Sequence, residues 1–308
     1  MDTFDVSIVI PTFNRREDLL VALDSAFSQT KVRVECIVVD DCSTDGTVEY
    51  IKGHYGNHPL TVIGKSQRSG PQASRNLGIC AAQGEFVAFL DSDDYLEPHT
   101  LEQRVQLCRR QGLDALFSGY RVRVAGRNWT LVKTVGSQTR ACPPDYAAAL
   151  RAFKICPTSS IMYRRAAFRD LKLDETLRSG HDDDLSLQLI RRGKYAFDDV
   201  PSMSLIQHLG ERVATPRNLM IGDAQLLHKY ERDVFQYHGR AYLTRRRAHA
   251  LAGLWSVGQF KLSGSLRPLR SDHGSMAAAL VLAAAYLPQR WFTLVRKRTM
   301  MAVARLFL

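Results

Sequence analysis

The first hundred residues alternate short apolar runs with amphipathic stretches. Between the first two runs, apolar residues from Leu19 to Phe27 recur at the three- and four-residue spacing of an amphipathic helix. A second helix is predicted from about Gln72 to Ala82. Strands and helices that alternate at this spacing predict an α/β fold, with a parallel sheet covered by helices. The apolar runs of strand length are residues 6–11, 35–41, 60–64 and 86–90.

The pattern changes after Pro98. A helix is predicted to about Gln111, and the sequence that follows alternates after Gly119 in the manner of an antiparallel or edge strand. Helical spacing returns from Leu185 to Ile190, and two short strands are expected to end at His208. We therefore expect a domain over residues 1–215, with halves 1–100 and 101–215, followed by a helical region over 216–308. The further strands are expected at residues 115–124 and 131–135.

The net charge of +11 lies entirely in the C-terminal region. Residues 217–308 hold 15 of the 42 Lys and Arg but only 4 of the 31 Asp and Glu. An apolar run over 276–288 is too short to span a bilayer core of about 30 Å. The last 18 residues combine Trp, Phe and Leu with four basic residues, which favours a helix lying on an anionic membrane surface. The alternative is a helical subdomain that packs its apolar face on the preceding domain. Nucleic acid is not expected as a partner, because these aromatic residues are not interleaved with basic ones as stacking platforms.

The cysteines and the N-terminus give an expectation of location. The six cysteines are widely spaced and form no C-x-x-C pair, which favours reduced thiols. The first residues carry acids where a signal peptide would be basic. We expect a cytoplasmic protein, peripheral on the inner face of the cytoplasmic membrane.

Two apolar runs end in carboxylates, at Asp40-Asp41 and at Asp91-Ser92-Asp93-Asp94. Open α/β sheets bind ligands outside the carboxyl ends of their strands, so these acids are expected at one rim. Like charges so placed favour a bound cation, and Mg²⁺ takes one or two carboxylates together with substrate phosphates. The alternative for each cluster is a solvated turn that caps the next helix. Neither G-x-G-x-x-G nor G-x-x-x-x-G-K-[ST] is present.

Four motifs occur in order in the first hundred residues, and together they resemble family 2 glycosyltransferases of the GT-A fold. The resemblance covers residues 1–100 strongly and residues 157–210 more loosely. It implies a Rossmann-like, mostly parallel central sheet flanked by helices. The motifs are SIVIPTFNR at 7–15, VVDDCSTDGT at 38–47, GPQASRNLGI at 70–79 and FLDSDD at 89–94.

The resemblance implies a role for each matching residue. The loop that packs on the nucleotide base corresponds to Pro11, Thr12 and Phe13, and the acids that face the base to Asp40 and Asp41. The D-x-D motif implies Mn²⁺ or Mg²⁺ on the donor diphosphate, with Asp94 as a neighbour or cap. A histidine after the last core strand matches His208, a metal or diphosphate contact by hypothesis. The implied metal ligands are Asp91, Asp93 and His208, and the other donor-binding residues are Arg75, Asn76, Asp91 and Ser92.

The general base implied by the resemblance is Asp182. It lies in Gly180-His181-Asp182-Asp183-Asp184-Leu185, where the family usually has Glu-Asp. His181 replaces the Glu, which puts the role of that position in doubt. A shift of one residue would make Asp183 the base, and a helix N-terminus stabilised by acids is the structural alternative.

These parts imply a metal-dependent, inverting glycosyltransferase of hexosyltransferase type. It would move a sugar from a nucleotide-sugar, a UDP-sugar first of all, to a hydroxyl of a glycan or lipid-linked acceptor. The setting would be bacterial surface polysaccharide biosynthesis. The alternative is a catalytically inactive nucleotide-sugar-binding protein with a regulatory or scaffold role.

Overall fold

The computed structural model describes residues 4–124, 130–133, 145–153, 155–207 and 215–256. These residues form two compact units. The described residues up to Glu175, together with those from His181 onward as far as Gln207, make up the first unit. The second contains Thr176–Gly180 and the described residues from Thr215. Each unit is described separately below.

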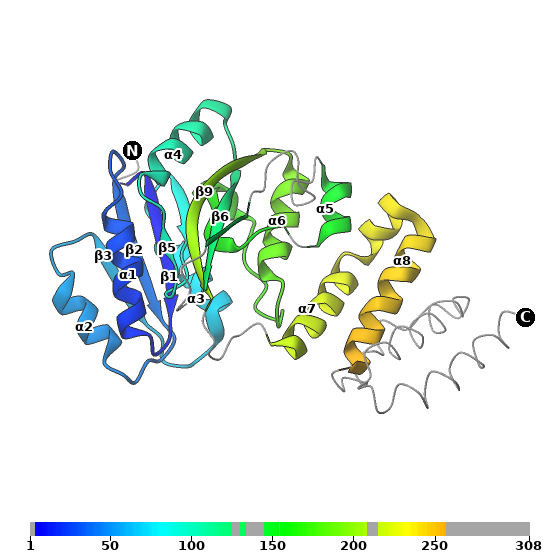
Figure 1. Cartoon of the computed structure of the whole chain (residues 1–308), viewed down its shortest axis with the longest axis horizontal. Helices are drawn as coiled ribbons and strands as arrows, with labels where there is room; N and C mark the ends of the chain where they lie inside the picture. Colours follow the sequence, from blue (N-terminus) through cyan, green and yellow to red (C-terminus); the bar gives the residue numbers. More distant parts are fainter. Residues whose placement is uncertain (1–3, 125–129, 134–144, 154, 208–214, 257–308) are drawn as a thin grey trace, which may run out of the picture. The chain divides into compact units, whose positions relative to one another are not determined.

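The first unit is built on one mixed sheet with the strand order β3-β2-β1-β4-β8-β6-β9-β5, and β7 pairs with β6 (Figure 1). The four strands β3, β2, β1 and β4 are parallel, as the sequence predicts. β8 is antiparallel to both β4 and β6, and this places the second half, residues 101–215, beside the first half in one continuous sheet. The strands are β1 Val6–Thr12, β2 Val34–Asp40, β3 Leu60–Gly64, β4 Phe86–Phe89, β5 Tyr95–Leu96, β6 Ala115–Val124, β7 Thr130–Lys133, β8 Ile161–Arg164 and β9 Tyr195–Gln207.

Helices cover both faces of the parallel half. Alternate β1 residues, Ile8 and Ile10, pack in one buried cluster with Leu23 of α1 and Leu101 of α4. The helix α3 packs on β1 and β2 from the opposite face of the sheet, where the Val9 side chain lies. The helices are α1 Arg16–Phe27, α2 Thr47–His54, α3 Gly70–Ala81, α4 Thr100–Gln111, α5 Tyr146–Ala152 and α6 His181–Arg192, with short turns η1 Thr158–Ser160 and η2 Arg165–Arg169.

Three boundaries differ from the sequence expectation. β1 extends through Thr12, so the loop after it begins at Phe13. A two-residue strand, β5, follows the acidic cluster and pairs with β9, where we had expected only the approach to a helix. The two short strands expected before His208 are one strand, β9, which pairs with β6 through a bulge that leaves Asp199, Val200 and Ser202 without register partners on β6. The bulge interrupts the alternation of side chains, which made one strand resemble two.

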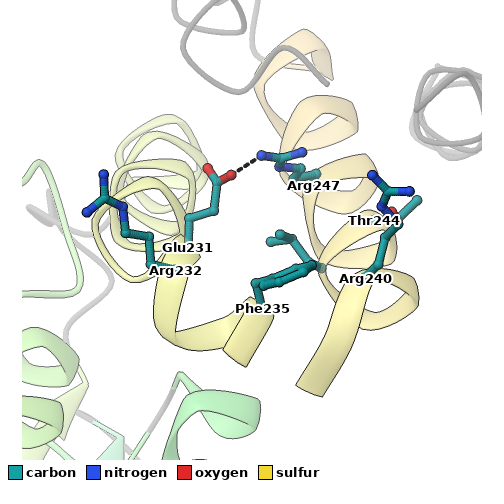
Figure 2. A pocket seen from close by; sticks show the side chains of 7 residues that line it. Glu231, Arg232, Phe235, Arg240, Thr244 and Arg247 are labelled. Carbon is teal, nitrogen blue, oxygen red and sulfur yellow. Dashed lines mark hydrogen bonds and ion pairs between the residues drawn. The ribbon is translucent and has the colours of Figure 1, made fainter. Parts of the chain in front are cut away.

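The second unit contains α7 (Pro216–Lys229) and α8 (Glu231–Ser256), so helices follow Pro216 as predicted. Gly239 has a φ of 75° and breaks α8 into two segments. A cavity of about 290 Å³ lies between the segments, with Phe235 among its lining residues (Figure 2). Arg247 of the second segment pairs with Glu231 of the first. None of the described helices is both long and apolar enough to span a membrane.

Gly78 allows α3 to approach the sheet closely. A Cβ built at Gly78 would lie 2.2 Å from Cγ1 of Val9, which no real Cβ tolerates. The motif GPQASRNLGI therefore contains a packing requirement in addition to its polar residues, because α3 carries Arg75 to the edge of the sheet.

We predict that Gly78→Ala lowers the free energy of unfolding by about 1–3 kcal/mol, the usual cost of overpacking. Gly53→Ala is the matched control, since a Cβ at Gly53 on α2 meets nothing within 4 Å. That control should be neutral or slightly stabilising, because alanine favours a helix. Urea unfolding measures both. Equal effects of the two changes would contradict the close packing of α3 on β1.

Candidate active site

The carboxyl ends of three neighbouring parallel strands bring the predicted donor-binding residues to one edge of the sheet. β1 ends at Thr12, its partner in register on β2 is Asp40, and β4 ends just before Leu90 and Asp91. Parallel pairing fixes this arrangement, because strands that run in one direction end on one side. This edge, together with α3, therefore brings residues of all four sequence motifs close to one another.

Asp41 is held by three donors. Its Oδ1 accepts hydrogen bonds from Lys65 Nζ at 2.5 Å and from the Ser69 backbone N–H at 2.9 Å. Its Oδ2 accepts from the Gly70 N–H, also at 2.9 Å. Burial alone would raise the pKa of Asp41, but these donors outweigh it and lower the pKa. Asp41 is therefore ionised and ties the loop before α3 to the end of β2.

The neighbouring side chains leave unpaired atoms at this edge. Asp40 Oδ2 accepts from the Ser43 N–H at 2.9 Å, whereas its buried Oδ1 has no hydrogen-bond partner among the described residues. Thr12 Oγ1 is also buried and unpartnered within the same part of the chain. The Phe13 ring is covered by the Arg68 guanidinium, whose centre lies 3.7 Å from the ring centroid. The edge thus offers polar atoms beside an aromatic ring.

The two carboxylates of the D-x-D motif pair with different arginines. Asp91 pairs with Nη2 of Arg75, and Asp93 pairs with Nη1 of Arg15. The Arg75 side chain is only 4% exposed, whereas that of Asp91 is 42% exposed. Asp91 therefore presents a carboxylate to solvent while a buried cation fixes its other side.

A closed ring of polar contacts connects Asp91 to Asp182. From Asp91 the ring passes to Arg75, whose Nη1 lies 3.2 Å from Nε2 of His181. That Nε2 lies 3.0 Å from Oδ1 of Asp182, which also accepts a hydrogen bond from Thr158 Oγ1 at 2.7 Å. The ring closes one residue later on η1, where Oγ of Ser159 accepts from the Asp91 N–H at 3.3 Å.

Asp182 is the member of the acidic triplet that belongs to this ring. Burial would raise its pKa, but the charge and hydrogen bond of His181, the charge of Arg75 and the Thr158 hydroxyl lower it well below the usual range. Asp183 instead accepts from the Ile155 N–H at 3.1 Å, and the fully buried Asp184 accepts from Gln188 at 3.0 Å. Both of these carboxylates are thereby committed to the local fold.

The remaining predicted site residues have different surroundings. The Asn76 amide turns toward the segment before residue 176, where it exchanges hydrogen bonds with the Leu173 backbone and donates to Glu175. Ser92 is buried. His208 lies outside the described residues. The donor-binding roles of Asn76 and Ser92 remain predictions, as does the metal role of His208.

The donor set at the end of β4 fits a hard divalent cation. Asp91 and Asp93 offer carboxylate oxygens, and their side chains are 42% and 24% exposed. Among the described residues, no group of three His, Cys, Asp or Glu side chains forms a complete metal site. A cation here would need further ligands from substrate, as Mg²⁺ usually does. Arg75 and Arg15, which form ion pairs with these carboxylates, would share them with that cation.

Comparison with known proteins identifies the family. The sequence profile of glycosyl transferase family 2 matches residues 7–172, more than half of the chain. The chain belongs to the family 2 glycosyltransferases. Among curated relatives, the succinoglycan biosynthesis protein ExoO of Rhizobium meliloti (strain 1021) is 28% identical over 225 residues, which cover 67% of this chain and 61% of that protein. The chain thus spans less than two thirds of the length of that relative.

Two solved structures share the fold. S. aureus TarS 1–349 in complex with UDP-GlcNAc has a TM-score of 0.63 and 22% identity, and the match covers 93% of this chain and 82% of that one. The mannosyltransferase PcManGT of Pyrobaculum calidifontis, in complex with GDP-Man and Mn²⁺, has a TM-score of 0.55 and 19% identity over 98% and 86%. The predicted GT-A fold with C-terminal helices is confirmed.

Sequence reasoning missed several residues that build this edge. Lys65, which follows β3 directly, had a usable signal, because a basic residue at the end of a strand beside an acidic one can pair with it. Arg15 lies inside the first motif but was given no role. Thr158 and Ser159 were not predicted as site residues, because no local pattern shows that this segment reaches Asp91 and Asp182.

Asp94 is a buried carboxyl with an elevated pKa. Burial and the charges of Asp91 and Asp93 raise the pKa of Asp94 to about 8, although its Oδ1 accepts from the Ile206 N–H at 2.9 Å. The unfolded chain releases this proton near pH 4. The contribution of the bound proton to the free energy of unfolding is therefore at its full value below about pH 4, and it is lost as the pH rises through about 8.

We predict that Asp94→Asn flattens the fall in the free energy of unfolding between about pH 5 and pH 8. The amide reproduces the neutral carboxylic acid and can still accept from Ile206. Urea unfolding across this range measures the slope, which Asp94 alone would contribute at up to about 1.4 kcal/mol per pH unit. Asp18→Asn removes an exposed carboxylate of the same charge and should leave the slope unchanged. An unaltered slope in Asp94→Asn would show that Asp94 is ionised.

Proposed function

We propose that this protein is a metal-dependent, inverting glycosyltransferase that moves a sugar from a nucleotide-sugar to a hydroxyl of a glycan or lipid-linked acceptor. The observation that carries the proposal is the closed ring. It holds Asp182, an ionised and partly exposed carboxylate, in a fixed relation to Asp91 at the end of β4. A transferase of this kind needs both a base for the acceptor and an anchor for the leaving diphosphate.

The donor is proposed to be a UDP-sugar bound across the ends of β1, β2 and β4. Phe13 provides a ring that a planar base can face, as the Arg68 guanidinium does here. One buried oxygen on Thr12 and one on Asp40 have no hydrogen-bond partner among the described residues. The Thr12 hydroxyl can donate to or accept from the nucleotide, and the Asp40 oxygen can accept from it. The UDP-GlcNAc bound to TarS supports a UDP-sugar, whereas PcManGT binds GDP-Man. The choice of UDP therefore rests on the higher structural similarity to TarS.

Asp91 and Asp93 are proposed to hold Mn²⁺ or Mg²⁺ on the donor diphosphate. A bound divalent cation supplies Lewis-acid stabilisation of the negative charge on the leaving group. The arginines Arg75 and Arg15 pair with these two carboxylates and hold them at the edge. The Mn²⁺ in the PcManGT structure supports this assignment.

The reaction is proposed to be a single displacement. Asp182 takes the proton from the acceptor hydroxyl, whose oxygen attacks the anomeric carbon while the bond to the diphosphate breaks. Inversion at the anomeric carbon follows from one displacement. Positioned general-base catalysis contributes about 10²- to 10⁴-fold to such a step. Asp182 is favoured over Asp183 because the Asp183 carboxylate accepts a backbone N–H from Ile155.

A nucleotide-sugar-binding protein without activity is the second candidate. Under this hypothesis, at least one of the reacting groups of the site would be missing or blocked. Asp91, Asp93 and Asp182 are all retained and partly exposed, which favours the enzyme.

The setting is proposed to be surface polysaccharide biosynthesis at the inner face of the cytoplasmic membrane. The similarity to ExoO, a succinoglycan biosynthesis protein, supports this class of pathway. In the described part of the C-terminal region, Phe235 and Tyr237 are about half exposed, and the exposed Arg232 and Arg240 line the cavity beside Phe235 (Figure 2). Aromatic and basic side chains together suit an anionic lipid surface.

We predict that Asp182→Asn lowers sugar transfer by about 10²- to 10⁴-fold while leaving nucleotide-sugar binding nearly unchanged. A screen of UDP- and GDP-sugars for hydrolysis without acceptor, read out as released UDP or GDP, first identifies the donor. Asp183→Asn is the matched control, because an amide oxygen can still accept from the Ile155 N–H. Near wild-type turnover in Asp182→Asn would reject Asp182 as the base. The absence of turnover with every donor in the wild-type protein would favour the binding protein instead.

We also predict that the full chain floats with liposomes that contain anionic phospholipid and not with neutral ones. Flotation should weaken as salt is raised, because screening reduces attraction to the surface. A DNA titration under the same conditions should show no comparable affinity. Binding to DNA without flotation would replace the membrane by nucleic acid as the partner of the basic region.

A further inference from the structure

Both polar contacts of the Asp182 carboxylate fall on one of its two oxygens. Thr158 Oγ1 donates to Oδ1 at 2.7 Å, and His181 Nε2 lies 3.0 Å from the same atom. Oδ2 has no hydrogen-bond partner among the described residues, and the Asp182 side chain is 32% exposed. The two oxygens are therefore chemically different although the group is a symmetric carboxylate.

We propose that Thr158 is a positioning residue that clamps Oδ1 of Asp182, so that Oδ2 is the oxygen that takes the proton from the acceptor hydroxyl. The inference rests on the proposed function and assigns the reacting atom within it. The terminal torsion of an aspartate is broad, so an unclamped carboxylate could exchange its two oxygens. The Thr158 hydroxyl on Oδ1 opposes that rotation and leaves the lone pairs of Oδ2 for the acceptor.

His181 lies against the same oxygen as the Thr158 hydroxyl. Its Nε2 is 3.0 Å from Oδ1 of Asp182 and 3.2 Å from Nη1 of Arg75, a group that can only donate. Gln72 Nε2 lies 3.4 Å from Nδ1 of the same ring. His181 therefore connects the buried Arg75 guanidinium to Oδ1, at a position where the family usually has Glu.

The Thr158 side of the clamp is anchored to the rest of the site through η1. Thr158 is only 2% exposed, and its neighbour Ser159 is tied to the Asp91 N–H. The buried Arg104 of α4 donates from Nη2 to the Ser160 carbonyl at 3.0 Å. A rigid turn therefore fixes the Thr158 hydroxyl relative to the D-x-D motif, and through it the orientation of Asp182.

The proton-transfer step is balanced with these atoms. The O–H bond of the acceptor breaks and an O–H bond forms on Oδ2, while the acceptor oxygen bonds to the anomeric carbon. The bond from that carbon to the diphosphate oxygen breaks, and its electron pair leaves with the nucleoside diphosphate. Oδ1 keeps the hydrogen bond from Thr158 throughout, so the clamp does not have to open for the proton to arrive.

Thr158→Val tests the clamp, because valine has nearly the shape of threonine but no hydroxyl. Loss of one hydrogen bond to a charged group predicts a fall in kcat for transfer of roughly 10- to 100-fold, with an unchanged Kd for the nucleotide. Thr158→Ser restores the hydroxyl and should recover most of kcat. A Val variant with wild-type kcat would overturn the inference. Equal losses in Val and Ser, accompanied by weaker nucleotide binding, would also overturn it and assign Thr158 to packing alone.

Wild-type protein that turns over no nucleotide-sugar would instead overturn the proposed function, so the two failures are distinguishable.

Discussion

The ion pair between Arg75 and Asp91 is the interaction on which the organisation of the site depends. A guanidinium that is only 4% exposed needs an anionic partner, because an unpaired charge inside a protein is costly. Asp91 meets that need with one side of its carboxylate and stays 42% exposed on the other. The same guanidinium reaches His181, so one buried cation links the end of β4 to the start of α6.

The fold supplies what this pair requires. Parallel pairing of β1, β2 and β4 brings three strand ends to one edge, and the glycine at position 78 lets α3 lie close enough to deliver Arg75 there. The antiparallel β8 then follows η1, which places the Thr158 hydroxyl against the Asp182 carboxylate and the Ser159 hydroxyl against the backbone N–H of Asp91. The site is therefore shared between the two halves of one continuous sheet.

The part of the site that sequence could predict is the part encoded locally. An apolar run that ends in acids specifies a strand and its charged end together, which is why Asp40, Asp41, Asp91 and Asp93 were placed at the correct edge. The contacts of Thr158, Lys65 and Arg15 are non-local and leave no periodic signal, so only the fold reveals them. The division of β9 into two predicted strands was wrong for a related reason, since three residues outside the ladder break the period that identifies a strand.

The central claim is that the carboxylates after β4 hold a nucleotide through a divalent cation, and calorimetric titration of UDP tests it most directly. The wild-type protein should bind UDP more tightly with Mn²⁺ than without, because the cation bridges the carboxylates and the diphosphate. In Asp93→Ala the response to Mn²⁺ should disappear while the weaker cation-independent binding persists. A variant that responds to Mn²⁺ as the wild type does would contradict this account of the site.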